Sequence, residues 1–149
     1  TTVMDFFPLE ERLFPIGRLD RDTTGVLLIS NDGELANKLT HPRYGIEKVY
    51  IASTYSEIPK NDLLKLKNGI QLEDGAIARG KMFFLRKSGK KYFWQIILKE
   101  GKKREVKRII TAMGSKVVDL HRESFAGLTL GNLKPGKYRR LKKTEIPKV

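Results

Sequence analysis

The sequence predicts an α+β fold with a mixed, largely antiparallel sheet flanked by helices. Segments with strand-like patterns outnumber helical segments, and the connections between them differ in length. No internal repeat or low-complexity stretch interrupts the chain. Because 149 residues with 40% hydrophobic side chains suffice for one core, we expect residues 1–149 to form a single domain.

The first predicted elements are a short strand and a helix. Residues 26–30 are a continuous apolar run, which is typical of a buried strand. Asp32 is a suitable N-cap for the helix, which should end before Pro42 because the residue preceding a proline disfavours the α conformation. The apolar side chains on its inner side are Leu35, Ala36 and Leu39.

A second strand and a second helix follow. Residues 48–55 alternate in the manner of a strand. Residues 59–67 favour a helix, with a proline near its first turn and Ser56 as a candidate cap. Asn68 and Gly69 are the expected stop.

The second half of the chain predicts a hairpin and the best-defined helix. Residues 80–86 and 91–99 read as the two strands of a hairpin, with its turn at residues 88–90. Apolar residues then recur with helical spacing, and Gly114 follows as the stop. These apolar residues are Val106, Ile109, Ile110 and Met113. Further strands are predicted for residues 116–120, 123–130 and 138–144.

The net charge of +13 is concentrated in one half of the chain. Residues 1–75 contain 9 basic and 12 acidic side chains, whereas residues 76–149 contain 21 and 5. Such asymmetry, with aromatic residues among the cations, favours a nucleic-acid partner. A solvated basic face and an anionic membrane surface are the alternatives. The membrane alternative lacks a long amphipathic helix with large apolar residues, since Trp94 falls in a predicted strand.

Several kinds of chemistry are excluded or disfavoured by composition. The chain has no cysteine, which excludes disulfides, thiolate zinc sites and thiol nucleophiles. The histidines, His41 and His121, have no second ligand at metal-binding spacing, so we expect no metal. No apolar run approaches the roughly 18 residues that span a bilayer.

The segment between Gly17 and Gly25 carries the most informative acid. Asp20 lies between Arg18 and Arg21, in a segment whose glycines allow sharp bends. A carboxylate between two guanidinium groups tends to stay ionised. On composition alone, an aspartate in this setting is also a common turn former or helix cap.

Residues 14–20 (FPIGRLD), continuing through residues 24–33, resemble the active-site motif of the RNA pseudouridine synthases. The similarity is greatest to the branch that modifies single uridines in bacterial ribosomal RNA. The resemblance implies a pseudouridine synthase catalytic domain that isomerises uridine without a cofactor, with Asp20 as the essential group. The target base must be flipped out, because its reacting atoms are inaccessible inside the RNA. Asp20 could act as a nucleophile or as a base at the sugar, and both routes stay open.

Four further residues take roles from the same resemblance. Lys107 matches the basic residue that pairs with the carboxylate, although Glu105 stands where the family usually has glutamine. Tyr50 matches the tyrosine that stacks on the target base, and Leu120 matches the aliphatic wall of the uracil pocket. Arg18 resembles an arginine that, in a related branch of the family, occupies the place in the RNA that the flipped base has left. Without the resemblance, Tyr50 and Leu120 would be read as ordinary packing residues.

Basic residues near these motifs are expected to bind RNA phosphates, so that affinity falls steeply with added salt. They are Arg21, Lys48, Lys102, Lys103, Arg104, Arg108 and Arg122. Helical spacing places Lys103 with Lys107 on one stripe and Arg104 with Arg108 on the next. Taken alone, this segment is equally typical of a solvated amphipathic helix.

The implied partner is ribosomal RNA, and we expect a cytoplasmic monomer with no metal, small-molecule cofactor or membrane. Many members of the branch carry a small RNA-binding domain ahead of the catalytic domain, and this sequence begins too late to contain it. The alternative is a non-catalytic basic rRNA-binding or ribosome-associated protein, which composition alone does not distinguish from an enzyme.

Overall fold

The computed structural model describes residues 13–148 and has the expected α+β architecture, with a mixed, largely antiparallel sheet. Within these residues, six strands form the main sheet in the order β10-β9-β4-β8-β7, and β2 pairs with β9. These strands are β2 (Thr23–Gly25), β4 (Lys48–Thr54), β7 (Lys81–Ser88), β8 (Lys91–Leu98), β9 (Val117–Phe125) and β10 (Leu128–Thr129). The β2–β9 pairing is parallel and the others are antiparallel.

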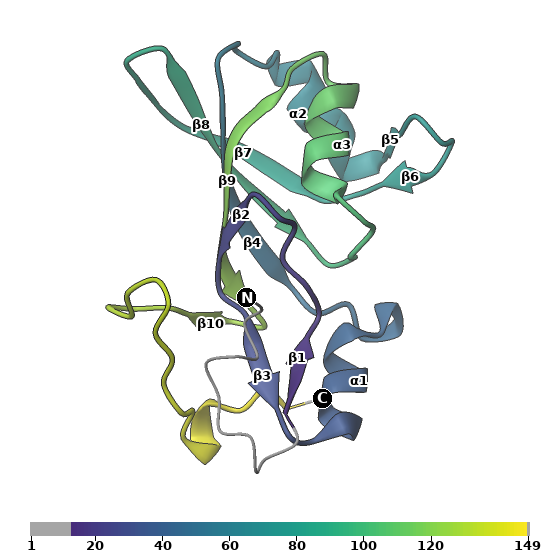
Figure 1. The fold of residues 1–149 in the computed structure, drawn as a ribbon. Coiled ribbons are helices and arrows are strands. Elements are labelled where there is room, and N and C mark those ends of the chain that lie inside the picture. The colour runs from purple at the N-terminus through teal and green to yellow at the C-terminus, as the bar shows by residue number, and fades with distance from the viewer. Residues whose placement is uncertain (1–12, 149) are drawn as a thin grey trace.

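The remaining elements flank this sheet (Figure 1). Two short antiparallel pairs join β1 (Phe14–Ile16) to β3 (Leu28–Ser30) and β5 (Ile70–Gln71) to β6 (Ile77–Ala78). The helices are α1 (Gly33–Thr40), α2 (Lys60–Asn68) and α3 (Glu105–Ala112), with 3-10 turns η2 (Pro42–Tyr44) and η3 (Lys143–Glu145).

The larger hydrophobic core lies between the sheet and the helices α2 and α3 (Figure 1). Alternate residues of β8 point into it, namely Trp94, Ile96 and Leu98, and each is at most 1% exposed. The indole nitrogen of Trp94 donates a hydrogen bond to the hydroxyl of Thr54 at 2.9 Å, which satisfies a buried polar atom. This core holds α3 firmly against the sheet.

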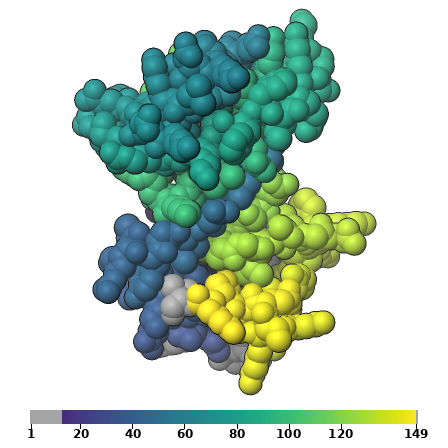
Figure 2. All heavy atoms as spheres, turned by 180° about the vertical axis from the view of Figure 1, so that it is seen from behind, coloured from purple at the N-terminus to yellow at the C-terminus, as the bar shows by residue number. Residues whose placement is uncertain are grey.

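A second hydrophobic cluster lies at the other end of the molecule, around Ile16, Val26, Leu39 and Phe125. The strand β9 joins the two clusters, because Leu120 belongs to the first and Phe125 to the second. Figure 2 shows the C-terminal segment, in yellow, at the end opposite to the teal hairpin of β7 and β8.

The local signals for the helices are confirmed with one exception. The side chain of Asp32 caps α1 by accepting hydrogen bonds from the amides of Glu34 and Leu35, both at 3.1 Å. The predicted cap of α2 is wrong: Pro59 precedes the helix, and the Ser56 hydroxyl lies 2.6 Å from that of Ser115 instead. Ser56 lies three residues before the N-cap position, too far from the first turn to cap the helix.

The predicted hairpin and the helix after it are also confirmed. The strands β7 and β8 enclose a turn at Gly89, whose φ of 61° suits glycine. All four apolar residues predicted for the inner side of α3 are buried, and Gly114 follows with a φ of 82°.

Three strand predictions need correction. The predicted strand at residues 26–30 is shorter: β3 covers only Leu28–Ser30, and Val26 precedes it and packs in the second cluster together with Leu28. Residues 116–120 and 123–130 fall on one continuous strand, β9, followed by the short β10.

The strand predicted for residues 138–144 does not form. This stretch is irregular and enters the 3-10 turn η3, with Arg139 paired to Glu145 at 3.0 Å. Almost every side chain between residues 134 and 144 is exposed, so neither face has a core to pack on.

Candidate active site

Asp20 lies in the loop that connects β1 to β2. The backbone bends at Gly17, where φ is 72°, and the carbonyl of Asp20 accepts a hydrogen bond from the amide of Thr23 at 2.9 Å. From Thr23 onward the chain pairs with β9 in parallel register, Thr23 opposite Leu120. The loop is therefore fixed at its downstream end by the main sheet.

Lys107 reaches this loop from the first turn of α3. Its ammonium nitrogen lies 4.0 Å from Oδ2 of Asp20, which is a charge contact rather than a hydrogen bond. The Lys107 side chain is 15% exposed and that of Asp20 is 34% exposed. The carboxylate is thus held beside a mostly buried cation and remains reachable from solvent.

Tyr50 and Leu120 lie on the same side of the sheet as α3. Tyr50 packs against the larger core, which contains the buried Leu120. Burial raises the pKa of the Tyr50 hydroxyl, the positive charge of Arg122 opposes this, and the negative charge of Asp20 adds to it. The structure therefore brings the predicted site residues Asp20, Tyr50, Lys107 and Leu120 into one neighbourhood.

Arg122, which the sequence predicts to contact an RNA phosphate, is buried in the structure. Only 2% of this residue is exposed, so a polyanion on the surface cannot reach its guanidinium group as it would a surface arginine. Its Nε instead donates to the carbonyl of Val26 at 2.9 Å, and its Nη1 donates to the carbonyl of Arg18 at 3.4 Å. The side chain of Arg18 itself is exposed.

Comparison with known proteins shows the family of the chain. Residues 2–112 match the sequence model of a family described as RNA pseudouridylate synthase. The chain belongs to the RNA pseudouridylate synthase family. The matched residues include both the loop with Asp20 and the helix with Lys107.

Individual relatives agree with the family assignment. A Bacillus subtilis protein named ribosomal large subunit pseudouridine synthase B is 44% identical over 150 residues, which cover 99% of this chain and 62% of that protein. A Salmonella typhimurium protein named ribosomal small subunit pseudouridine synthase A is 34% identical over 153 residues, covering 99% and 64%. The chain thus spans less than two thirds of the length of these relatives.

A solved structure confirms the fold. The crystal structure of a pseudouridylate synthase superposes with a TM-score of 0.89 at 33% identity, covering 97% of this chain and 64% of that one. The structure of an H/ACA ribonucleoprotein bound to a substrate RNA gives a TM-score of 0.61 at 15% identity, which supports the fold alone.

The other predicted phosphate-binding residues of this family member fall into two groups. Arg21, Lys103 and Arg104 are exposed. Lys102 and Arg108 are bound to carboxylates, and Lys48 is half-buried and donates to the carbonyl of Glu100 at 3.2 Å. The expected stripes also change, because α3 begins only at Glu105 and Arg104 precedes it with a φ of 52°.

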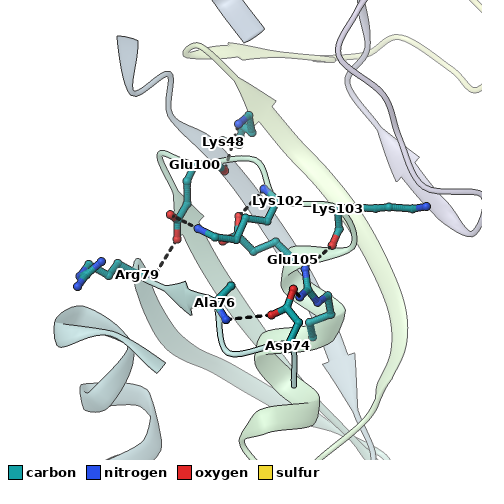
Figure 3. A network of polar contacts seen from close by, with 9 residues as sticks. Lys48, Asp74, Ala76, Arg79, Glu100, Lys102, Lys103 and Glu105 are labelled. Atoms are coloured by element: carbon teal, nitrogen blue, oxygen red, sulfur yellow. Dashed lines mark hydrogen bonds and ion pairs between the residues drawn. The ribbon is translucent and has the colours of Figure 1, made fainter. Parts of the chain in front are cut away.

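A network of charged residues anchors the start of α3 (Figure 3). Lys102 Nζ lies 2.7 Å from Glu100 and 3.7 Å from Oε2 of Glu105, while Glu105 Oε1 accepts from the Lys102 amide at 3.1 Å. Burial and the neighbouring Glu100 raise the pKa of Glu105 to about 7. Figure 3 shows the side chain of Lys103 pointing away from this network.

A cavity lies beside β2, β4, β8 and β9, and Ala52 and Leu120 of the larger core are among its lining residues. Its volume is about 180 Å³, and its lining includes Ile51, Phe93, Asp119 and His121. These residues alternate along their strands with side chains that enter the larger core. Among residues 13–148, no group of three or more His, Cys, Asp or Glu could hold a metal ion. No helix in this part of the chain is long and apolar enough to cross a membrane.

The hairpin of β7 and β8 carries a surface that the residue-by-residue predictions missed. Phe83 and Phe84 are about half exposed on β7. Arg86 lies 4.3 Å from the centre of the Phe93 ring, and Lys87 lies 5.0 Å from that of Tyr92. The available signal was the mixture of aromatic and basic residues in the second half of the sequence, without a motif to single out these positions.

Proposed function

We propose that this protein isomerises uridine to pseudouridine in ribosomal RNA, with Asp20 as the essential catalytic group. The observation that carries the proposal is the pairing of the partly exposed Asp20 carboxylate with Lys107 at 4.0 Å, next to Tyr50, on the fold of this enzyme family. The chain spans 62% of the length of the relative that is 44% identical to it. The activity of such a whole protein is therefore part of the proposal.

The reaction is balanced without any added reagent. The bond between C1′ of the ribose and N1 of uracil breaks, the base turns, and a new bond joins C1′ to C5. The C5 proton leaves, and N1 gains a proton. Asp20 acts on the sugar as a nucleophile or as a base, and the ammonium group of Lys107, 4.0 Å away, holds the carboxylate in position.

The residues around Asp20 suit a flipped base. Tyr50 offers an aromatic ring for stacking, a contact worth roughly 1–3 kcal/mol per base. Leu120, 6% exposed, supplies an apolar wall next to it. The 34% exposure of Asp20 leaves room for a nucleoside that has left the RNA stack, at a cost of a few kcal/mol.

The surface charge supports an RNA substrate. The chain has a net charge of +13, and Arg21, Lys103 and Arg104 are exposed around the Asp20 loop and the start of α3. The relative named for the large ribosomal subunit is 44% identical, against 34% for the one named for the small subunit. Large-subunit rRNA is therefore the preferred substrate in the proposal.

The test is turnover on two RNAs. The protein is incubated with large-subunit and small-subunit rRNA transcripts labelled with tritium at C5 of uridine, and released tritium is counted. We expect release from the large-subunit RNA, limited to one or a few sites. A non-catalytic rRNA-binding protein would bind the transcripts and release tritium from neither, which would refute the proposal.

A further inference from the structure

We propose that Arg122 is a positioning residue that holds together the two ends of the loop carrying Asp20. The inference rests on the proposed role of Asp20 and adds a residue that does not itself touch the substrate. Arg122 lies on β9, opposite Tyr50 of β4 and Gly25 of β2, so it occupies the junction between the sheet and the loop.

The guanidinium group bridges the loop. Nη1 donates to the carbonyl of Arg18, two residues before Asp20, and Nε donates to the carbonyl of Val26, six residues after it. A guanidinium group is planar and its donors have fixed directions, so two such bonds define the separation and orientation of the groups they join. The bonds are 3.4 Å and 2.9 Å long.

The backbone of Arg122 holds the same segment. Its carbonyl accepts from the amide of Val26 at 3.0 Å. A Cβ atom placed on Gly25 would lie 2.1 Å from that carbonyl oxygen, so only glycine allows the loop to approach β9 this closely. Gly25 also has a φ of 122°, a conformation that other residues rarely adopt.

The burial of Arg122 indicates that its main role is to make these hydrogen bonds within the protein. Within residues 13–148, its Nη2 has no hydrogen-bond partner, and its guanidinium carbon lies 4.8 Å from the centre of the Phe125 ring. Burying an arginine in this way is unfavourable, because the desolvation of the charge is offset only by the two carbonyls, the Tyr50 hydroxyl and a ring. A hydrophobic residue would fill the same space without the desolvation cost of a charge, but it would not join Arg18 to Val26.

The consequence concerns the position of the carboxylate. Asp20 is held by Lys107 at 4.0 Å and by one backbone hydrogen bond of its own, so its loop depends on the two ends that Arg122 joins. A displacement of about 1 Å at a reacting group costs on the order of 100-fold in rate. Loss of the bridge should therefore slow the chemical step and leave RNA binding almost unchanged.

The test compares Arg122→Lys, which keeps the charge, with Arg122→Met, which keeps only the bulk. The single-turnover rate at saturating RNA should fall about 10-fold in the first and about 100-fold in the second, while the Kd for RNA changes less than about 3-fold. Arg140→Met, at an exposed position, is the matched control and should retain the wild-type rate. Gly25→Ala places a Cβ against the backbone of Arg122 and so displaces the loop from β9. It should likewise lower the single-turnover rate while leaving the Kd for RNA almost unchanged.

Hydrogen exchange supplies a readout that does not need activity. Amides in residues 18–26 should exchange at least about 10-fold faster in both Arg122 variants, and those of β8 should be unaffected. Unchanged exchange in this loop would overturn the proposal, even if the wild type formed no pseudouridine. An unchanged rate in folded Arg122→Met would also overturn it, as would a loss of RNA affinity equal to the loss of rate.

Discussion

Lys107 of α3 and Asp20 of the β1–β2 loop face each other with 4.0 Å between Nζ and Oδ2. The two residues are 87 positions apart in the sequence and are brought together by separate elements. The helix is fixed by the larger core, whereas the loop is fixed by β9. The distance between them is therefore a property of the whole sheet.

Replacing Lys107 with methionine should remove most activity without unfolding the protein. Methionine has an apolar side chain similar in length to the lysine stem, but it lacks the positive charge beside Asp20. We therefore expect a rate reduction of about 100-fold or more. Single-turnover assays and a thermal melt measure the two properties. A near-wild-type rate would show that Asp20 does not depend on this cation.

Lys103 and Arg104 should contribute to RNA affinity but not to the chemical step. Both are exposed, and Lys103 points away from the network at the start of α3. Lys103→Met and Arg104→Asn should each lower the slope of log K against log salt by about 0.7 for single-stranded RNA. Asparagine is chosen because it tolerates the φ of 52° at position 104. An unchanged slope would place the RNA elsewhere on the surface.

Tyr50 should act through its ring. Tyr50→Phe keeps the ring and should retain activity within a few-fold, whereas Tyr50→Ala loses a stacking contact worth roughly 1–3 kcal/mol, or about 5- to 150-fold in kcat/KM. Equal losses in the two variants would instead assign the role to the hydroxyl.

Glu105 should make stability depend on pH. Its pKa of about 7 lies above the ordinary 4.5, so the folded protein binds more protons than the unfolded chain between these values. Stability therefore falls as pH rises from about 4.5 to about 7. Glu105→Gln should flatten this part of the curve and be more stable than wild type at pH 8. Denaturant unfolding at several pH values measures the effect, and parallel curves for the two proteins would contradict it.

The sequence predicts those parts of the fold that depend on neighbours along the chain. The cap at Asp32, the hairpin turn at Gly89 and the apolar side of α3 follow from local spacing and are confirmed. The strand predicted at residues 138–144 failed because alternation alone does not provide a sheet edge to pair with. The Ser56 cap failed because the helix begins only at Lys60, with Pro59 at the N-cap position.

The site shows the same division. The motif around Asp20 identifies the family, but neither spacing nor composition tells which cations face solvent. Arg122 and Arg104 look alike in the sequence, yet one is buried under the loop and the other is exposed. The difference arises from β9, whose pairing with β2 and β4 covers Arg122 from both sides.

The most direct test of the account is the Asp20→Asn variant, assayed by tritium release from C5-labelled rRNA. Asp22→Asn is the matched control, because it makes the same change two residues away at an exposed position. We predict that Asp20→Asn releases less than about one-thousandth of the wild-type tritium while binding RNA within a few-fold, and that Asp22→Asn stays active. Turnover by Asp20→Asn at a rate close to that of Asp22→Asn would contradict the central claim.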